Sequence, residues 1–235
     1  MQVILIPAYK PTLKLISLIR DIQALSNEKI IVIDDGSGND YKSIFKNISS
    51  LNCHVVTHQE NLGKGAAIKT GIKYAHQTFE HIDAFLTCDA DGQHLPKDII
   101  HILSESKDNP DALILGTRSF KEAHVPFRNR LGNSFSSFYF KLYTGKKCPD
   151  TQTGLRVIPS SMTDDALSIK ENRYDYEMSF LLKQAKLGRK LIYVPIETVY
   201  DQKNADSHFR PIKDSILIYK QPIKFTLASL SSAVI

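Results

Sequence analysis

The chain has 235 residues, of which 42% are hydrophobic and 23% are charged, an ordinary globular composition and enough for one α/β domain or two small ones. The net charge of +5 is mild, and we expect no nucleic-acid partner. Three cysteines, Cys53, Cys88 and Cys148, show no metal-binding or disulfide spacing, which favours a reducing cytoplasmic compartment. The N-terminus has no basic stretch before its first apolar run and does not resemble a signal peptide.

Short apolar runs alternate with helical patterns along the first half. The run at 3–6 predicts a buried strand that ends at Pro7. Further strands are expected at 30–33, 55–56, 84–87 and 112–115, and helices at 13–25, 44–48, 66–76 and 95–103. This alternation predicts an α/β fold with a doubly wound, mostly parallel sheet and flanking helices.

The second half is less regular but has neither linker composition nor a repeat. We expect a strand at 157–158, a helix from Tyr174 to Gly188 and a strand at 191–196. This half should complete the site of the first half, so that residues 1–210 form a single domain.

The last residues, 211–235, are predicted to be an amphipathic, juxtamembrane segment. Basic side chains up to Lys224 precede 11 uncharged residues, too few to span a bilayer, which needs roughly 20. This pattern fits a membrane surface on the cytoplasmic side, or the start of a membrane region beyond residue 235. The alternative is an apolar segment packed on the domain.

Polar clusters follow four of the predicted strands, where each strand ends. Ligands bind outside the carboxyl ends of parallel strands, so we expect these clusters to share one crevice. The clusters are at 7–9, 34–37, 89–91 and 116–118.

The stretch CDADGQH at 88–94 is the most informative of these clusters. Asp89 and Asp91 stand one residue apart after a buried strand, a pattern that suits a hard divalent ion. Mg²⁺ usually takes one or two protein carboxylates and fills its other positions with water and substrate phosphates. The alternative is an acidic turn. His94 is the only histidine whose position suggests a function.

Two further loops leave alternatives open. Gly63, Lys64 and Gly65 lead into a helix and could cradle a phosphate through backbone amides, or could be a simple helix-entry turn. Asp34 and Asp35 could form a second metal pair, or accept hydrogen bonds from a base or a ribose.

Charged residues in the second half carry weaker signals. Arg118, Arg128 and Arg130 could bind an anion or could be solvated surface residues. Asp175 and Glu177 open a helix, so capping alone would account for them.

Taken in order, these blocks resemble the inverting family 2 glycosyltransferases, and among them the dolichyl- or polyprenyl-phosphate sugar transferases, of the dolichol-phosphate mannosyltransferase type. The resemblance covers nearly the whole chain. It is carried by IPAY at 6–9, DDGSG at 34–38, NLGKGAA at 61–67, CDADGQH at 88–94, GTR at 116–118, DTQTGLR at 150–156, YDYEM at 174–178, VPI at 194–196 and SHFRP at 207–211.

The resemblance implies a GT-A (Rossmann-like) catalytic domain at the cytoplasmic face of the cell membrane. It implies a nucleotide-diphosphate sugar as donor, a polyprenyl phosphate of the undecaprenyl type as acceptor, and Mg²⁺ or Mn²⁺ as cofactor. The implied metal ligands are Asp89, Asp91 and Gln93. The implied nucleotide-sugar contacts are Pro7, Ala8, Tyr9, Asp35, Lys64, Asp89, Ala90, Asp91, Ser207 and Arg210. The implied catalytic residues are Asp91, Arg118, Arg130, Asp150 and Glu177.

One departure concerns the donor. Lys10 and Pro11 stand where the commoner family pattern has Asn-Glu, which bears on the base contact. A uridine diphosphate sugar is favoured over a guanosine one. The sequence leaves open whether the chain forms a homo-oligomer.

The implied acceptor simplifies the chemistry. A phosphate monoester with a second pKa of roughly 6 is largely dianionic at neutral pH and needs little help from a general base. The alternatives are a family 2 enzyme acting on a hydroxyl of a polysaccharide or teichoic acid, a sugar-phosphate nucleotidyltransferase, and a non-catalytic module that binds a nucleotide sugar.

Overall fold

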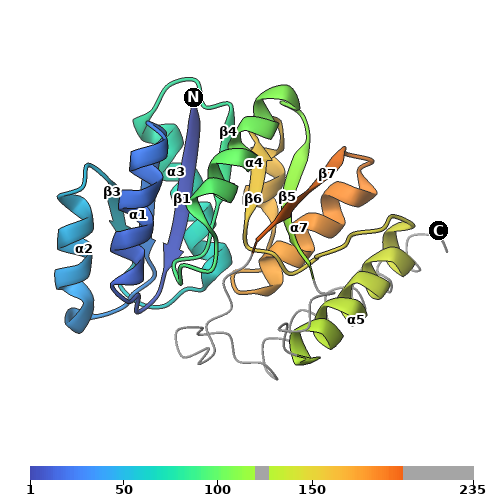
Figure 1. Cartoon of the computed structure of the whole chain (residues 1–235), viewed down its shortest axis with the longest axis horizontal. Coiled ribbons are helices and arrows are strands. Elements are labelled where there is room, and N and C mark those ends of the chain that lie inside the picture. The colour runs from blue at the N-terminus through green and yellow to red at the C-terminus, as the bar shows by residue number, and fades with distance from the viewer. Residues whose placement is uncertain (120–126, 198–235) are drawn as a thin grey trace.

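The computed structural model describes residues 1–119 and 127–197 (Figure 1). Ser207, Arg210 and the segment 211–235 lie outside the described residues. The strands are β1 (Gln2–Ala8), β2 (Lys29–Asp34), β3 (His54–Thr57), β4 (Ala84–Thr87), β5 (Leu113–Arg118), β6 (Arg156–Pro159) and β7 (Leu191–Ile196). The α-helices are α1 (Lys14–Leu25), α2 (Lys42–Ser49), α3 (Lys64–Thr78), α4 (Pro96–Asp108), α5 (Phe127–Thr144), α6 (Thr163–Ser168) and α7 (Asp175–Lys186), and short 3-10 turns lie at η1 (Asn39–Tyr41) and η2 (Ser160–Met162).

The seven strands form one sheet in the order β3-β2-β1-β4-β6-β5-β7. β6 runs antiparallel to β4 and β5, and the other paired strands run parallel. The prediction of a doubly wound, mostly parallel sheet is therefore confirmed. The order reverses between β1 and β4, which is where a ligand crevice is expected in this architecture.

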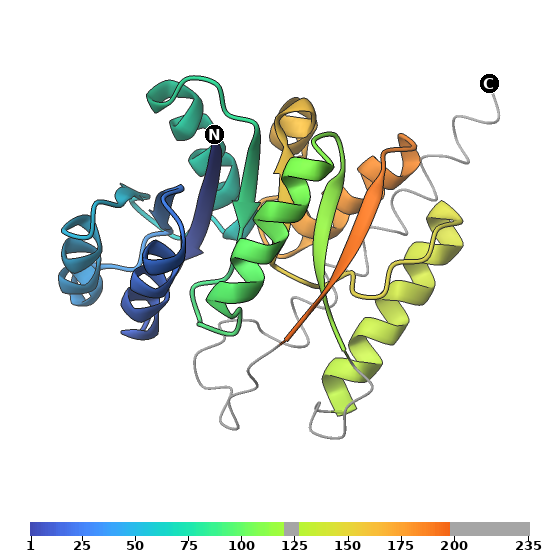
Figure 2. The same ribbon diagram turned by 45° about the horizontal axis from the view of Figure 1, so that its top comes forward.

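Helices cover both faces of the sheet. Side chains that alternate along β1 point to opposite faces: Ile4 and Ile6 pack with α1, α2 and α4, whereas Val3 and Leu5 pack with α3 and α7. Figure 2 shows α4 in front of the sheet and α7 behind it. Each fully buried aliphatic side chain contributes about 1.5–3 kcal/mol to folding, so the two layers hold the sheet rigid beneath its loops.

The first strand continues past the proline that was expected to end it. β1 includes Pro7 and Ala8, and Pro7 stands opposite Ile33 of β2. The carbonyl of Leu5 accepts from the amide of Cys88 just after β4, and the carbonyl of Ala8 accepts from the amide of Asp35 just after β2. Because successive residues of a strand point to opposite sides, the backbone of Pro7 faces the β4 side. Since β4 pairs with β1 only as far as Leu5, the missing N–H of Pro7 breaks no ladder bond.

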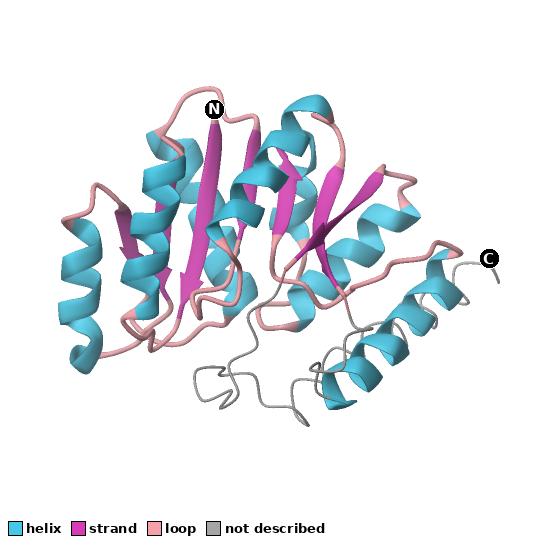
Figure 3. Cartoon of the chain, viewed as in Figure 1, coloured by secondary structure: helices cyan, strands magenta, loops and turns pink. Residues whose placement is uncertain are grey.

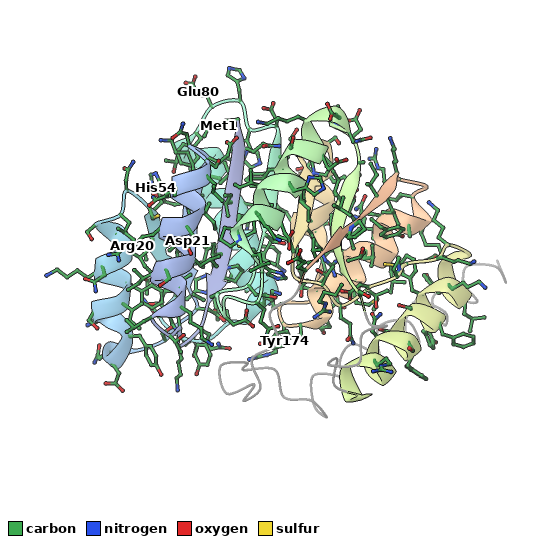
Figure 4. The ribbon with its side chains drawn as sticks, in the orientation of Figure 1. Met1, Arg20, Asp21, His54, Glu80 and Tyr174 are labelled. Carbon is green, nitrogen blue, oxygen red and sulfur yellow. The ribbon has the colours of Figure 1, made fainter. Side chains whose placement is uncertain are left out.

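The carboxyl ends of the parallel strands lie along one edge of the sheet, at the bottom of Figure 3. Tyr174, which precedes α7, lies at this edge, whereas Met1 lies at the opposite one (Figure 4). Because β6 is antiparallel, its first residue rather than its last lies at the same edge, with Arg156 opposite Thr87. No helix in the described ranges is both long and apolar enough to cross a membrane.

Candidate active site

The carboxylate pair lies in the turn between β4 and α4. Asp91 Oδ1 accepts the backbone N–H of Gln93 at 3.0 Å. Asp89 Oδ1 lies 2.6 Å from the ammonium of Lys64, and its Oδ2 lies 3.4 Å from the ring of His94. His94 is buried, and it supports Asp89 from the α4 side.

The two carboxylates have opposite electrostatic environments. Burial and the neighbouring Asp89 raise the pKa of Asp91 above its ordinary value. Burial would also raise the pKa of Asp89, but the Lys64 ammonium and the His94 ring outweigh it and hold that pKa well below its ordinary value. The protein therefore compensates the negative charge of Asp91 less than that of Asp89.

This donor set fits a hard cation. A divalent ion beside Asp91 would relieve the cost of its buried charge, and oxygen ligands are those that Mg²⁺ and Mn²⁺ prefer. In residues 1–119 and 127–197, no group of three or more His, Cys, Asp and Glu side chains gathers as a metal site. The predicted donors, two carboxylates and the amide of Gln93, suit an ion that is shared with substrate phosphates.

Lys64, at the start of α3, connects two parts of the site. Its ammonium lies 2.6 Å from Asp89 and 3.0 Å from Glu177 at the start of α7. Burial would lower the pKa of Lys64, but the two carboxylates outweigh it and raise that pKa. Glu177 does not cap its helix, because Tyr174 is the N-cap residue and no side chain caps it. The capping alternative therefore does not account for Glu177.

The loop before Lys64 is held from both sides. The amides of Leu62 and Gly63 donate to Asp35 at 2.9 and 2.8 Å, and the amide of Ala66 donates to the Asn172 carbonyl at 3.0 Å. A side chain at Gly65 would collide with Tyr176.

These contacts favour the helix-entry alternative for the loop. Three of its amides are already used within the protein, and the second glycine permits close packing onto α7. Lys64 uses its side chain within the site, and a phosphate cradle through the amides of Lys64 and Gly65 stays a prediction.

Asp35 is nearly fully buried and organises this loop. Besides the two amides, its carboxylate contacts the ring of His58 at 2.8 Å, and that ring contacts Thr70 at 2.9 Å on its other nitrogen. The predicted contact of Asp35 with the nucleoside stays a prediction. His58 had no sequence signal beyond being a histidine, since its partners are 12 and 23 residues away.

The end of β1 meets the end of β2. The amide of Lys10 donates to Ser37 Oγ at 2.8 Å, and Lys10 adopts a positive φ of 50°. Its ammonium lies 5.3 Å from the centre of the Tyr9 ring. Pro7, Ala8 and Tyr9 are thus on the same edge as Asp35, as expected for one crevice.

Arg118 at the end of β5 pairs with Asp150 in a two-pronged contact. Its Nε and Nη2 donate to the two carboxylate oxygens at 2.6 and 3.0 Å, and its backbone amide also reaches Asp150. Asp150 is completely buried, whereas the Arg118 side chain keeps 17% of its surface exposed. This geometry fixes the guanidinium plane at the carboxyl end of β5.

The helix α5 is tied to the loop that carries Asp150. Asn133 donates to the Pro149 carbonyl at 2.7 Å and accepts from the Thr151 amide at 3.2 Å, and Ser136 contacts the Thr151 hydroxyl. Arg130, in the same helix, is partly buried. The side chain of Arg128 lies outside the described residues, as do Ser207 and Arg210. The links through Asn133 and Ser136 were not predicted.

Comparisons with known proteins agree with this architecture. The family model for glycosyl transferase family 2 matches residues 3–165. The chain is 29% identical over 221 residues to a UDP-N-acetylglucosamine–dolichyl-phosphate N-acetylglucosaminyltransferase of Methanococcus voltae, covering 85% of this chain and 86% of that protein. It is 24% identical over 203 residues to an undecaprenyl-phosphate mannosyltransferase of Micrococcus luteus, covering 83% and 82% of the two chains.

A solved structure shares the fold. The glucosyl-3-phosphoglycerate synthase of Mycobacterium tuberculosis, crystallised with Mn²⁺, UDP and glucosyl-3-phosphoglycerate, superposes with a TM-score of 0.66 at 15% identity. The match covers 97% of this chain and 79% of that one. At this identity the likeness concerns the fold, which is GT-A.

Proposed function

The chain belongs to glycosyl transferase family 2, and from that premise we propose that it transfers a sugar from a nucleotide diphosphate to a polyprenyl phosphate, with inversion, for cell-envelope glycosylation. The observation that carries the proposal is the arrangement along the sheet edge. The carboxylate pair follows β4, and the Arg118–Asp150 pair follows β5 on the other side of β6. A diphosphate with its metal fits the first, and an anionic acceptor fits the second.

The proposed donor is a UDP-sugar in the crevice between β1 and β4. Pro7, Ala8, Tyr9 and Asp35 would contact the nucleoside, and Ser207 and Arg210 would contact the phosphates. Mg²⁺ or Mn²⁺ held by Asp89, Asp91 and Gln93 would neutralise charge on the leaving nucleoside diphosphate. The preference for uridine is supported by the name of the Methanococcus relative and by the UDP in the Mycobacterium structure.

The residues of the chain then supply positioning and electrostatics. A dianionic phosphate attacks the anomeric carbon from the face opposite the leaving group, which turns an α-linked donor into a β-linked product. Arg118 would hold the attacking phosphate in line, because Asp150 fixes its orientation, and Arg130 would add positive charge. Lys64 would stay beside the leaving diphosphate, supported by Glu177 and by Asp89.

A lipid acceptor also fits the surface of α5. Phe135, Phe138 and Leu142 are 50%, 64% and 70% exposed, and their spacing of three and four residues places them on one helix face. Exposed apolar side chains on the helix that also carries Arg130 suit an isoprenoid chain that ends in a phosphate. We further propose that the enzyme acts at the cytoplasmic face of the membrane, with residues 1–210 as the catalytic domain and residues 211–235 as the membrane-facing segment.

A hydroxyl acceptor is less well supported. It would need a carboxylate that is available to take a proton, but Asp150 is paired with Arg118 and Glu177 with Lys64.

The proposal is tested by incubating the protein with Mn²⁺ and labelled UDP- or GDP-sugars in the presence of undecaprenyl phosphate, 3-phosphoglycerate or a polysaccharide. We expect label in the organic phase with a UDP-sugar and undecaprenyl phosphate only. Label on the polysaccharide or on 3-phosphoglycerate would overturn the acceptor assignment, and thermal stabilisation by a UDP-sugar without any product would indicate a binding module.

A further inference from the structure

Arg156 is a buried cation at the edge of the sheet that carries the active site. It begins β6 and keeps only 2% of its surface exposed. Because β6 is antiparallel, Arg156 stands opposite Thr87, two residues before Asp89 on the neighbouring strand. The guanidinium therefore lies inside the protein, beneath the loops of the site.

The contacts of Arg156 are made with backbone carbonyls. Its Nε donates to Thr153 at 2.9 Å, its Nη2 to Thr151 at 3.0 Å and its Nη1 to Glu177 at 2.6 Å. Within residues 1–119 and 127–197, no carboxylate forms an ion pair with it. A buried charge without a counter-ion is costly. Here three backbone carbonyls stabilise the guanidinium, whose planar, forked set of N–H donors only arginine offers.

The three carbonyls belong to two segments of the proposed site. Thr151 and Thr153 lie in the loop that carries Asp150, and Glu177 lies in the first turn of α7. The same loop packs on the carboxylate pair, because a side chain at Gly154 would collide with Asp89 and the Gly154 carbonyl accepts from Thr87 at 3.0 Å.

We propose that Arg156 is a positioning residue: it fixes the positions of the loop that carries Asp150 and of the first turn of α7 relative to Asp89. It touches no substrate and acts through Asp150 and Glu177. This inference rests on the proposed transferase function. An arginine that merely filled the core would instead affect stability alone.

Two variants and a control separate these roles. Arg156→Lys keeps the charge but loses the fork, and Arg156→Met removes both. Gln2→Met is the matched control, because Gln2 is a buried polar side chain at the opposite edge of the sheet that bonds the Leu103 carbonyl. Each variant is measured for unfolding temperature, binding of UDP with Mn²⁺, kcat with undecaprenyl phosphate, and amide hydrogen exchange.

We expect Arg156→Lys to fold and to bind UDP within about threefold of wild type, while kcat falls by about 100-fold, the loss typical of a small misplacement of reacting groups. Arg156→Met should lose more turnover than Arg156→Lys. Gln2→Met should lower the unfolding temperature and leave kcat within about twofold of wild type.

The hydrogen-exchange readout does not depend on activity. In Arg156→Lys the amides of 150–155 and 175–179 should exchange at least about tenfold faster, and those same amides should be unchanged in Gln2→Met. Unchanged exchange in Arg156→Lys would overturn the proposal even if wild type shows no transfer activity. A kcat that falls no further than in Gln2→Met, or UDP binding that falls as much as kcat, would overturn it as well. If Arg156→Met does not fold, Arg156→Lys alone decides.

Discussion

The ammonium of Lys64 lies 2.6 Å from Asp89 Oδ1, so the lysine that begins α3 and the carboxylate that follows β4 form an ion pair. The pair fixes which carboxylate is compensated by the protein. Asp89 has Lys64 and His94 as partners, whereas burial and the neighbouring Asp89 make the ionised form of Asp91 less favourable. The protein alone therefore leaves negative charge at Asp91 that a bound cation would stabilise.

Asp91→Asn should stabilise the metal-free protein. The pKa of Asp91 is raised in the folded state, so its ionised form destabilises the fold at pH 7. This penalty is absent below the ordinary pKa of 3.8 and is complete once the pH has risen through the folded pKa. We expect the unfolding temperature without metal at pH 7 to rise by about 2–4 °C, the shift for about 1 kcal/mol at this chain length.

The same variant should lose its response to metal. Mn²⁺ should raise the unfolding temperature of wild type but not of Asp91→Asn, and transfer should fall by at least about 100-fold. An unfolding temperature below that of wild type in EDTA, or near-normal metal-dependent turnover, would remove Asp91 from the account.

Lys64→Met should destabilise the protein by about 1–3 kcal/mol, because it leaves Asp89 and Glu177 without their shared cation. This loss of unfolding free energy is smaller than that expected for breaking a fully buried ion pair, because the Asp89 side chain is one-third exposed. Lys97→Met is the matched control, because the Lys97–Glu197 pair is exposed to solvent and its loss should leave the free energy of unfolding nearly unchanged.

The difference in unfolding free energy between wild type and Lys64→Met should depend on pH in a predictable way. The lowered pKa of Asp89 makes its contribution present above 3.8 and lost as pH falls. The raised pKa of Lys64 makes its contribution present below 10.5 and lost as pH rises through the folded pKa. Denaturant unfolding should therefore show a constant gap between wild type and Lys64→Met across neutral pH that closes in acid; a gap that widens in acid would contradict the pairing.

Gly65→Ala tests what the glycine loop does. A side chain at 65 meets Tyr176, so we expect a loss of about 1–3 kcal/mol in unfolding free energy without any ligand. Gly145→Ala is the control: a side chain there meets nothing, and only its positive φ of 73° would be strained. Unchanged stability of Gly65→Ala together with weaker UDP binding would favour the phosphate-cradle interpretation instead.

The strands and the polar clusters near their carboxyl ends were predictable from the sequence, because an apolar run followed by a polar cluster marks each of them. The exact strand ends were not, since β1 continues to Ala8 and β5 continues to Arg118. This pattern located Tyr9, Asp35, Asp89 and Arg118 on one edge of the sheet. The antiparallel direction of β6 was not predictable, since a short apolar run such as Val157-Ile158 carries no sign of strand direction.

Contacts between distant segments were also beyond the sequence. The pairing of Lys64 with Glu177 depends on the packing of α3 against α7, and Arg156 resembled any charged residue at the head of a strand. Its full burial among carbonyls follows only from the tertiary fold. The approach of Gly65 to Tyr176 has the same origin, which is why a cradle and a helix-entry turn could not be told apart beforehand.

The central claim is that the nucleophile is a lipid phosphate. The most direct measurement compares transfer of labelled sugar from the same UDP-sugar, with Mn²⁺, to undecaprenyl phosphate and to undecaprenol, which differ only in the phosphate. We predict labelled lipid with undecaprenyl phosphate and none above background with the alcohol. Equal labelling of the alcohol, or no labelling of the phosphate by any UDP- or GDP-sugar, would contradict the account.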